Sequence, residues 1–561
     1  MSIDFYIECL DCGCKAPFQA GSPACPSCKS LWREARYDYD SLGPQFLNLI
    51  KDSPFNLWRY RDLLPVRSPN LDYSLGEGGT PLIRAVNLGM MLGTSTLFIK
   101  DERQGPTASF KDRQAAVTVA ALKEDGITEF VIASTGNVAI SYSAYSARAG
   151  IKLWAFLTSL VPAEKMREVA LYGTQVIKIT GSYDQAKQVA AEYARHRGLN
   201  QDMGARTIPC IESMKTIAFE IAEQLTNRLG PPEYEPGKPP AALRVPDWYI
   251  QSVSGGMGPI GVLKGFDELC KMGLTNKMPK VAAIQAEGCA PMAHAWKQNR
   301  ETAIPVQSPR TLIATLATGD PGRTYTVLRQ KILSANGGTI DYVSDEEAFR
   351  AMHYLAKMEG LSIEPASGVA FAGLVKLMRA GVIKPNETIV VNCTGHTMPI
   401  ESNILGEGWS RDIVMPNQGI NSGNEEGLLA ALSKLAIDRY PRIAIVDDNP
   451  DVRRLVRRIL QSQGNYILFE AENGRDALEL INREHPNLVI LDLMMPELDG
   501  FAVLDELRNS PDTAEIPVIV ITAKELTTDE KNRMRGHIQT LMQKGDFMSD
   551  ELLDEVKALL G

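Results

Sequence analysis

Four cysteines near the start of the chain have the types and spacing of a metal site. Cys9 and Cys12 form one Cys-x2-Cys pair, and Cys25 and Cys28 form a second pair after twelve intervening residues. Two such pairs can present four thiolates to one tetrahedral Zn²⁺ ion, and their clustering favours a metal over disulfides. Cys14 could replace Cys12, although its spacing is less regular. We expect a structural zinc site here.

A lysine and three polar turns, far apart along the chain, have residue types that could each take part in binding or catalysis. Lys111 opens a helical pattern, and Thr394 directly follows a strand-like segment. Ser134, Thr135 and Asn137 stand where another strand-like segment turns into a helix. Taken singly, these residues are also typical of solvated charges and helix caps. A glycine-rich strand-to-helix turn, whose backbone N–H groups can close on a phosphate, comprises Ser254, Gly255, Gly256, Met257 and Gly258.

Carboxylates follow two strand-like segments in the last 120 residues of the chain. Asp447 and Asp448 follow one segment, and Asp492 follows another; Thr522 and Lys544 hold similar places further on. The carboxyl ends of parallel strands meet at one edge of a sheet, so these side chains should converge. Three converging carboxylates repel one another unless a divalent cation lies among them, which predicts a magnesium site.

Short apolar runs bounded by turn residues predict the strands that position these groups. Runs that are apolar on both faces are typical of buried parallel strands, and helical patterns lie between them. This alternation predicts an α/β fold built from βαβ units. Before residue 411 the expected strands are 96–100, 130–133, 152–156, 175–180, 248–251, 281–285 and 388–392. In the C-terminal part they are 442–446, 467–470, 488–491, 517–521 and 539–542.

Composition and charge narrow the possible classes of function. The chain has 561 residues, 44% of them hydrophobic, and a net charge of −9. The acidic excess lies in residues 441–561, with 23 acidic and 14 basic side chains, and the rest is balanced. No basic surface for a phosphate backbone is indicated, so we expect no nucleic-acid partner. Without a signal peptide or a long apolar run, we expect a cytoplasmic protein that does not bind membranes.

In their order along the chain, the central motifs resemble those of fold-type II pyridoxal-phosphate (PLP) enzymes, most closely the threonine synthase group. The resemblance includes Gly-Glu-Gly-Gly-Thr-Pro-Leu at 76–82 and Glu-Pro-Ala-Ser at 364–367. It covers roughly residues 5–410, the cysteine cluster included. It implies two α/β subdomains, as in the tryptophan synthase β subunit, and PLP as cofactor.

The resemblance also implies roles for single residues. Lys111 would bind the cofactor aldehyde covalently and then remove the substrate Cα proton, because a desolvated lysine beside a cation loses its own proton readily. Asn137 would bind the cofactor's 3′-oxygen, and the loop 254–258 would bind its phosphate. Ser134 and Thr135 would bind the substrate carboxylate.

The reaction type and the substrate are less closely defined by the resemblance. Thr394 would face the pyridine nitrogen, where a hydroxyl favours elimination and replacement over transamination. Threonine synthases usually carry a phosphate-binding arginine in the stretch that is 208–216 here, and this chain has none there, although Arg206 and Lys215 are near. A phosphate needs such donors. Both O-phosphohomoserine and an amino acid with a smaller or uncharged leaving group therefore remain open as substrates.

The C-terminal 120 residues resemble the receiver domain of two-component systems, a flavodoxin-like five-stranded parallel fold. The resemblance implies that Asp492 accepts a phosphoryl group, and that Asp447, Asp448 and the Met494 carbonyl bind Mg²⁺ with it. The receiver switch residues would be Thr522, which moves, and Lys544, which neutralises the phosphate. The aromatic residue that often completes the switch is replaced by Leu541.

The expected organisation is a zinc ribbon at 1–40, a catalytic domain at 41–414, a linker with a helix at 415–440 and a receiver domain at 441–561. We expect a PLP-dependent lyase or synthase acting at the β or γ carbon of an amino acid under receiver control. The alternatives are a β-replacing synthase for O-phosphoserine or O-acetylserine, and a non-catalytic amino-acid sensor in a phosphorelay. Expected partners are the amino-acid substrate, a sensor histidine kinase or phosphotransfer protein, and a second copy in a homodimer.

Overall fold

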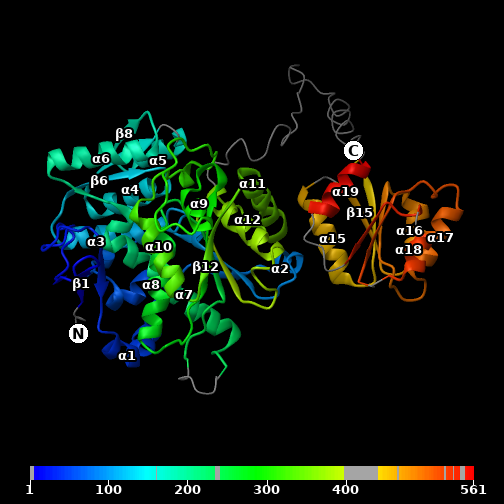
Figure 1. Cartoon of the computed structure of the whole chain (residues 1–561), viewed down its shortest axis with the longest axis horizontal. Helices are drawn as coiled ribbons and strands as arrows, with labels where there is room; N and C mark the ends of the chain where they lie inside the picture. The colour runs from blue at the N-terminus through cyan, green and yellow to red at the C-terminus, as the bar shows by residue number, and fades with distance from the viewer. Residues whose placement is uncertain are drawn as a thin grey trace, which may run out of the picture. The chain divides into compact units, whose positions relative to one another are not determined.

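The computed structural model describes residues 5–158, 161–233, 241–396, 440–463, 466–523, 526–534, 536–543 and 550–560 (Figure 1). By their contacts, these residues fall into two units. The first unit contains the described residues of 5–85, 96–352 and 362–396. The second contains 86–95, 353–361 and the described residues from 440 onward. The predicted linker, 415–440, lies outside the described residues except for its last residue.

A small antiparallel sheet carries the cysteine pairs. Its strands are β1 (Tyr6–Cys9), β2 (Lys15–Ala16) and β3 (Arg33–Arg36), in the order β2-β1-β3. Cys9 ends β1, and the second cysteine pair lies in the connection between β2 and β3. The sheet therefore brings two loops, one from each cysteine pair, to the same end.

The largest sheet has six strands in the order β12-β11-β10-β13-β5-β4. Its neighbouring pairs are parallel except for β4 and β5. The central strands β5, β10 and β13 are buried at every residue, as expected for a parallel sheet covered on both faces. The strands are β4 (Leu82–Arg84), β5 (Leu97–Asp101), β10 (Trp248–Ser252), β11 (Lys280–Ala286), β12 (Gly338–Val343) and β13 (Ile389–Cys393).

A second parallel sheet has four strands in the order β8-β7-β6-β9. They are β6 (Glu129–Ser134), β7 (Lys152–Thr158), β8 (Gln175–Ile179) and β9 (Asn200–Gln201). The two sheets correspond to the two α/β subdomains that the sequence indicates.

Helices surround these sheets and build the core between them. Helix α4 packs against α3, α3 against α7, and α7 against α8. Gly261 and Gly265 of α8 permit this packing, because a Cβ atom at either position would lie within 2.6 Å of an α7 carbonyl oxygen. The helices are α1 (Tyr39–Lys51), α2 (Val86–Met91), α3 (Lys111–Glu124), α4 (Asn137–Ala149), α5 (Ala163–Leu171), α6 (Tyr183–Arg197), α7 (Ile208–Leu229), α8 (Met257–Lys271), α9 (Pro291–Lys297), α10 (Arg323–Ser334), α11 (Asp345–Tyr354) and α12 (Pro365–Arg379). The short helices are η1 (Leu57–Leu63), η2 (Leu71–Tyr73), η3 (Glu102–Gln104), η4 (Gly204–Arg206), η5 (Glu287–Cys289), η6 (Ala314–Leu316) and the π-helix η7 (Leu355–Glu359).

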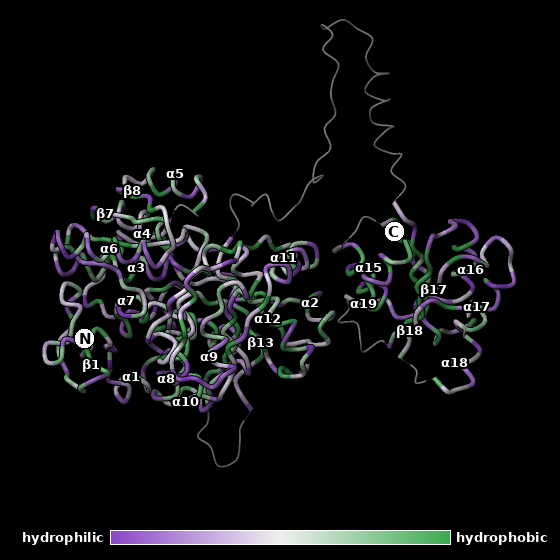
Figure 2. The backbone as a smooth tube through the Cα atoms, turned by 45° about the horizontal axis from the view of Figure 1, so that its top comes forward, coloured by the Kyte–Doolittle hydropathy of each residue, from purple (hydrophilic) through white to green (hydrophobic). Residues whose placement is uncertain are grey.

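The C-terminal part contains a five-stranded parallel sheet in the order β15-β14-β16-β17-β18. Hydrophobic residues gather along its strands, whereas hydrophilic residues are common on its outer helices (Figure 2). The strands are β14 (Arg442–Val446), β15 (Ile467–Ala471), β16 (Leu488–Leu491), β17 (Val518–Thr522) and β18 (Thr540–Gln543). The helices are α15 (Pro450–Gln463), α16 (Gly474–Glu484), α17 (Gly500–Asn509), α18 (Thr528–Met534) and α19 (Asp550–Leu560).

The predicted α/β fold class is confirmed, and every predicted strand is present with small shifts at its ends. Outside the small N-terminal sheet, for which no strands were predicted, three further strands were not predicted: β4, β9 and β12. Strand β12 lies at a sheet edge, where Asp341 interrupts the apolar run, so it lacks the pattern of a fully buried strand. Within the described parts of the chain, no helix is long and apolar enough to cross a membrane.

Candidate functional site

A cavity of about 650 Å³ in the first unit is lined by all of the residues predicted to bind PLP. Lys111 opens α3, Thr135 and Asn137 follow β6, and Thr394 follows β13. The glycine-rich loop 254–258, between β10 and α8, forms another wall. These groups meet because the carboxyl ends of parallel strands and the first turns of the following helices open toward the same space.

The segment before Lys111 is fixed to the chain that follows β13. The Phe110 N–H donates to the Thr394 carbonyl at 3.0 Å, and the His396 N–H donates to the Ala108 carbonyl at 3.0 Å. Ala108 itself has a φ of 56°, an unusual value for a residue with a side chain. These contacts hold the start of α3, and hence the lysine, beside Thr394.

The Lys111 amine lacks a hydrogen-bond or ion-pair partner among the described residues and lies 4.4 Å from the Phe110 ring centroid. Removal from bulk water lowers the pKa of Lys111 to about 8, although the negative charges of Asp202 and Glu364 oppose this shift. An amine with such a pKa is partly neutral near pH 7, which a nucleophile or a base requires.

The glycine-rich loop provides the geometry of a phosphate site. Gly256 is the N-cap of α8 with a φ of 82°, so the chain turns sharply and the first N–H groups of the helix have no partner within it. Gly258 lies so close to the Gln251 amide that a Cβ atom there would be 2.4 Å from Gln251 Nε2. The hydroxyl of Ser254 shares a hydrogen bond with the hydroxyl of Thr318.

Glu364, for which no role was predicted, connects two of the predicted site residues. Its carboxylate accepts hydrogen bonds of 2.7 Å from both the Thr394 hydroxyl and the Asn137 amide. The Ser367 hydroxyl lies 2.9 Å from the Thr394 hydroxyl and accepts the Thr394 N–H at 2.8 Å. Glu364 and Ser367 both belong to the Glu-Pro-Ala-Ser motif at 364–367, which is the sequence feature that could have indicated their place in the site.

Ser134 is not among the residues that line the cavity. Its hydroxyl accepts hydrogen bonds from the Gly136 N–H at 3.0 Å and the Ala139 N–H at 3.1 Å, so it caps the start of α4. Of the two residues predicted to bind the substrate carboxylate, only Thr135 lines the cavity.

The basic residues near the cavity differ in their availability to a ligand. Lys215 is buried, and its amine is 2.6 Å from Glu212 and 3.0 Å from Glu268. It therefore forms ion pairs inside the protein and is not available to a ligand in the cavity. Arg206 lines the cavity, and among the described residues its side chain has no hydrogen-bond or ion-pair partner. Arg323 and Lys187 also line the cavity, each already paired with an aspartate.

The chemistry of the cavity fits the expected cofactor. PLP needs an amine for its aldehyde, N–H donors for its phosphate and polar groups for its ring. Besides the groups described above, the buried Ser252 hydroxyl and the buried Gln114 carbonyl oxygen lie on the cavity wall without a hydrogen-bond partner in the described residues. Buried polar atoms of this kind are normally satisfied, so they point to a polar ligand.

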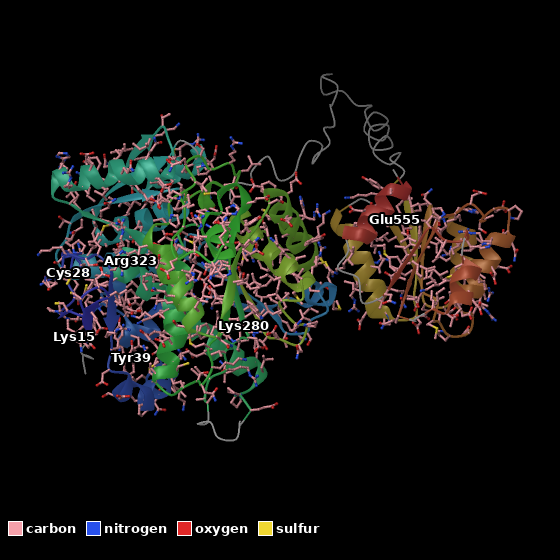
Figure 3. All side chains as sticks on the ribbon, viewed as in Figure 1. Lys15, Cys28, Tyr39, Lys280, Arg323 and Glu555 are labelled. Atoms are coloured by element: carbon pink, nitrogen blue, oxygen red, sulfur yellow. The ribbon has the colours of Figure 1, made fainter. Side chains whose placement is uncertain are left out.

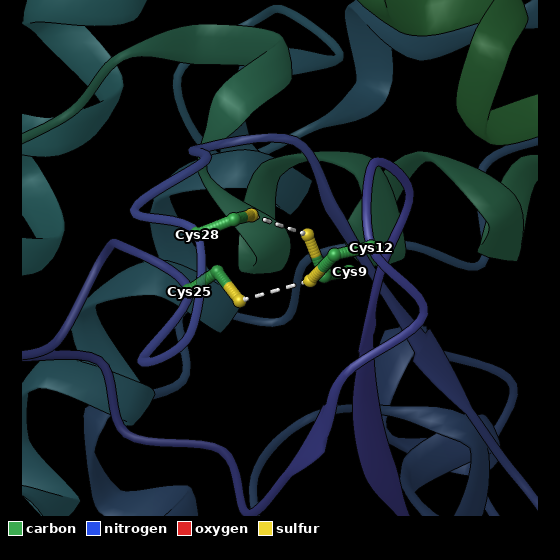
Figure 4. Close-up of side chains that lie close together, drawn as sticks. All are labelled: Cys9, Cys12, Cys25 and Cys28. Atoms are coloured by element: carbon green, nitrogen blue, oxygen red, sulfur yellow. Dashed lines mark hydrogen bonds between the residues drawn. The ribbon is translucent and has the colours of Figure 1, made fainter.

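The four predicted cysteine ligands form a compact cluster (Figure 4). Their sulfur atoms all lie within 4.8 Å of one another, with Cys9 and Cys28 separated by 3.5 Å and Cys12 and Cys25 by 3.7 Å. Thiolates 2.3 Å from a tetrahedral zinc ion lie about 3.8 Å apart, so the spacing fits Zn²⁺. Cys12 belongs to the cluster and Cys14 does not, so Cys12 is the fourth candidate ligand.

The predicted carboxylates of the C-terminal sheet also converge. Asp447, Asp448 and Asp492 place ligand oxygens within 4.8 Å of one another. Asp492 is buried, and its Oδ1 accepts the Met494 N–H at 3.2 Å. Thr522 lies buried at the end of the neighbouring strand β17. Lys544 lies outside the described residues.

Comparison with known proteins agrees with this arrangement. Residues 73–395 match the family model of pyridoxal-phosphate dependent enzymes, and residues 443–557 match that of response regulator receiver domains. Threonine synthase of Methanosarcina acetivorans is 33% identical over 409 residues, which cover 72% of this chain and 94% of that protein. Threonine synthase of Methanocaldococcus jannaschii is 34% identical over 365 residues, 65% of this chain and 85% of that protein. The chain therefore belongs to the pyridoxal-phosphate dependent enzymes, as a threonine synthase-like lyase that also carries a response regulator receiver domain.

Proposed function

We propose that this protein converts O-phosphohomoserine to threonine in the cavity that contains Lys111. The observation that carries the proposal is the convergence of a partly neutral lysine, a phosphate-binding loop and unpaired basic and polar side chains on one cavity. The similarity to curated threonine synthases supports the reaction type.

Each residue of the site has a distinct task in this proposal. Bound PLP supplies an electron sink for negative charge at the substrate Cα. Lys111, Asn137, Thr394 and the loop 254–258 would hold PLP, and the Lys111 amine would take and return the Cα proton. Glu364 would orient the side chains of Asn137 and Thr394, because it accepts a hydrogen bond from each.

The cavity also contains groups suited to a substrate phosphate. Arg206 would take the place of the arginine that the sequence lacks within 208–216, because it lines the cavity and its side chain has no partner in the described residues. Lys215, the other nearby candidate, is engaged by buried glutamates. A guanidinium fork suits a phosphate dianion better than an uncharged leaving group, so we favour a phosphate ester as substrate.

Purified PLP-loaded protein should release phosphate and form threonine from O-phosphohomoserine faster than it uses O-phosphoserine or O-acetylserine. Arg206→Gln should raise KM for O-phosphohomoserine by about 10–100-fold, because it removes a charged hydrogen bond to the phosphate. The control is Arg195→Gln, which alters an exposed residue of α6 paired only with Glu192 among the described residues. Faster use of O-acetylserine, with no effect of Arg206→Gln, would contradict the proposal.

We propose further that phosphorylation of Asp492 by a sensor histidine kinase or phosphotransfer protein controls the enzyme, with Mg²⁺ held by Asp447, Asp448, Asp492 and the Met494 carbonyl. Zn²⁺ at the cysteine cluster would be structural. The aspartate cluster fits a divalent cation, because three carboxylates so close would otherwise repel one another. A tethered receiver acts at high effective concentration, so even weak coupling can be populated.

Beryllofluoride with Mg²⁺ should change turnover or oligomeric state of the full chain by roughly 5–150-fold, the usual range for such coupling. Asp492→Asn should abolish this response while PLP binding is unchanged. Asp451→Asn, at an exposed position on α15, is the matched control and should respond normally. Identical kinetics and sedimentation with and without beryllofluoride would refute phosphorylation control.

A further inference from the structure

The carboxylate of Asp11 links the cysteine cluster to helix α10. Asp11 lies between Cys9 and Cys12, and its two oxygens accept hydrogen bonds from Arg323, at 2.9 Å from Nη1 and 2.5 Å from Nη2. The Ser30 hydroxyl donates a hydrogen bond of 2.6 Å to Asp11 Oδ2. Because Ser30 comes two residues after the second cysteine pair, both cysteine loops hold this carboxylate.

A second contact fixes the face of the same guanidinium. The Arg323 guanidinium carbon lies 5.2 Å from the centroid of the Trp32 ring, which β3 follows directly. The Trp32 backbone N–H donates to the Ser30 hydroxyl at 3.0 Å, so the backbone that carries the ring is tied to the second cysteine loop. Figure 3 shows Arg323 and Cys28 on neighbouring parts of the first unit.

The contacts with Asp11 and Trp32 orient the Arg323 guanidinium but do not use all of its N–H donors. Trp32 and Arg323 both line the cavity that contains Lys111. Pairing with Asp11 occupies one N–H of each terminal nitrogen, which leaves Nε–H and the outer N–H groups for another acceptor. An arginine held by its edge and its face loses little further freedom when it binds an anion.

The Asp11–Arg323 pair has little value for folding alone. The two side chains are 37% and 41% exposed, and ion pairs at that exposure contribute almost nothing to stability. Its position on the cavity wall gives it a different use.

We propose that Arg323 binds the anionic group on the substrate side chain together with Arg206, which lines the same cavity, and that Asp11 is the positioning residue of Arg323. The zinc ribbon is then part of the substrate site as well as a structural module. The inference rests on the proposed function for its ligand class, an amino acid that bears a phosphate or another anion.

Binding of inorganic phosphate to the full-length, zinc- and PLP-loaded protein, measured by calorimetry, tests the inference without turnover. Arg323→Gln should weaken phosphate binding by ~10–100-fold, because it removes a charged donor. Asp11→Ala should weaken it by roughly 5-fold, and the double variant should match Arg323→Gln, because Asp11 acts only through Arg323. Glu8→Gln removes a different ion pair of the ribbon, with Arg36 at 2.8 Å, and should leave phosphate binding unchanged.

Kinetics with O-phosphohomoserine provide the second readout. The same variants should raise KM in proportion to their loss of phosphate binding and change kcat by less than about 3-fold, because they alter binding and not proton transfer. Measuring the zinc content checks that the Asp11→Ala variant keeps its metal. The Arg323→Gln substitution lies in α10, outside the cysteine loops. Unchanged phosphate affinity and unchanged KM in Arg323→Gln would overturn the inference. Phosphate binding that depends on Arg323 and Asp11, without any threonine formation, would refute the proposed substrate and leave this inference standing.

Discussion

Lys111→Ala should lower turnover by about 10³-fold or more, because it removes the group proposed to move the Cα proton. Borohydride should fix the cofactor to a peptide containing Lys111 in the unchanged protein, and should fix none in the variant. The variant should still hold PLP noncovalently, since the loop 254–258 is intact. The measurement is steady-state turnover together with peptide mapping after reduction.

Lys187→Ala provides a matched control for this experiment. Lys187 also lines the cavity, but its amine is 2.6 Å from Asp184, so it is not a free nucleophile. That variant should retain covalent attachment of the cofactor at Lys111. In the unchanged protein prepared without cofactor, the rate at which added PLP becomes bound covalently to Lys111 should rise as the pH approaches about 8 and then level off. The reason is that the pKa of Lys111 is lowered to about 8 and only the neutral amine reacts. Full activity in Lys111→Ala would refute the assignment.

Glu220→Ala should lower the free energy of unfolding by about 3–5 kcal/mol, because it leaves two buried cations without their shared partner. Glu220 accepts hydrogen bonds of 2.6 Å from Lys100 and 2.6 Å from Arg113, and all three side chains are almost completely buried. Helix α7 is connected in this way to β5 and α3. Denaturant unfolding with fluorescence detection measures the loss.

The pH dependence and a surface control test the same interaction. Although burial raises it, the charges of Arg113 and Lys100 lower the pKa of Glu220 to about 2. The depressed pKa means that the stabilisation is complete above about pH 4.3, the ordinary value, and is lost as pH falls toward 2. Glu192→Ala, which removes an exposed pair with Arg195, should change stability by less than about 1 kcal/mol. Equal effects of the two substitutions would contradict the argument.

The sequence by itself determined the α/β class, the positions of most strands and the groups placed at their ends. This was possible because these features are local: a buried parallel strand must be apolar along its length, and a side chain directly after it must emerge at the edge of the sheet. The resemblance to fold-type II PLP enzymes, and not the strand ends alone, predicted that Lys111, Asn137, Thr394 and the loop 254–258 share one site. Ligand spacing alone likewise predicted the cysteine cluster.

Only the tertiary structure decided which polar side chains line the cavity and which form hydrogen bonds or ion pairs elsewhere in the protein. Ser134 and Thr135 are neighbours in sequence, yet the first caps α4 and the second lines the cavity. Lys215 and Arg206 were equal candidates for a phosphate, but buried glutamates engage only Lys215. Availability depends on partners that are distant along the chain, and a linear pattern does not record them.

The same reason explains why no sequence pattern indicated the pairing between Asp11 and Arg323. The two residues are 312 positions apart, and each is an ordinary charged residue in its own segment. Their meeting depends on how the small antiparallel sheet packs beside α10, which is decided by the shape of the folded core. Local sequence patterns determine the helices and strands and the side chains at their ends. The packing between these elements determines which of those side chains line the same cavity.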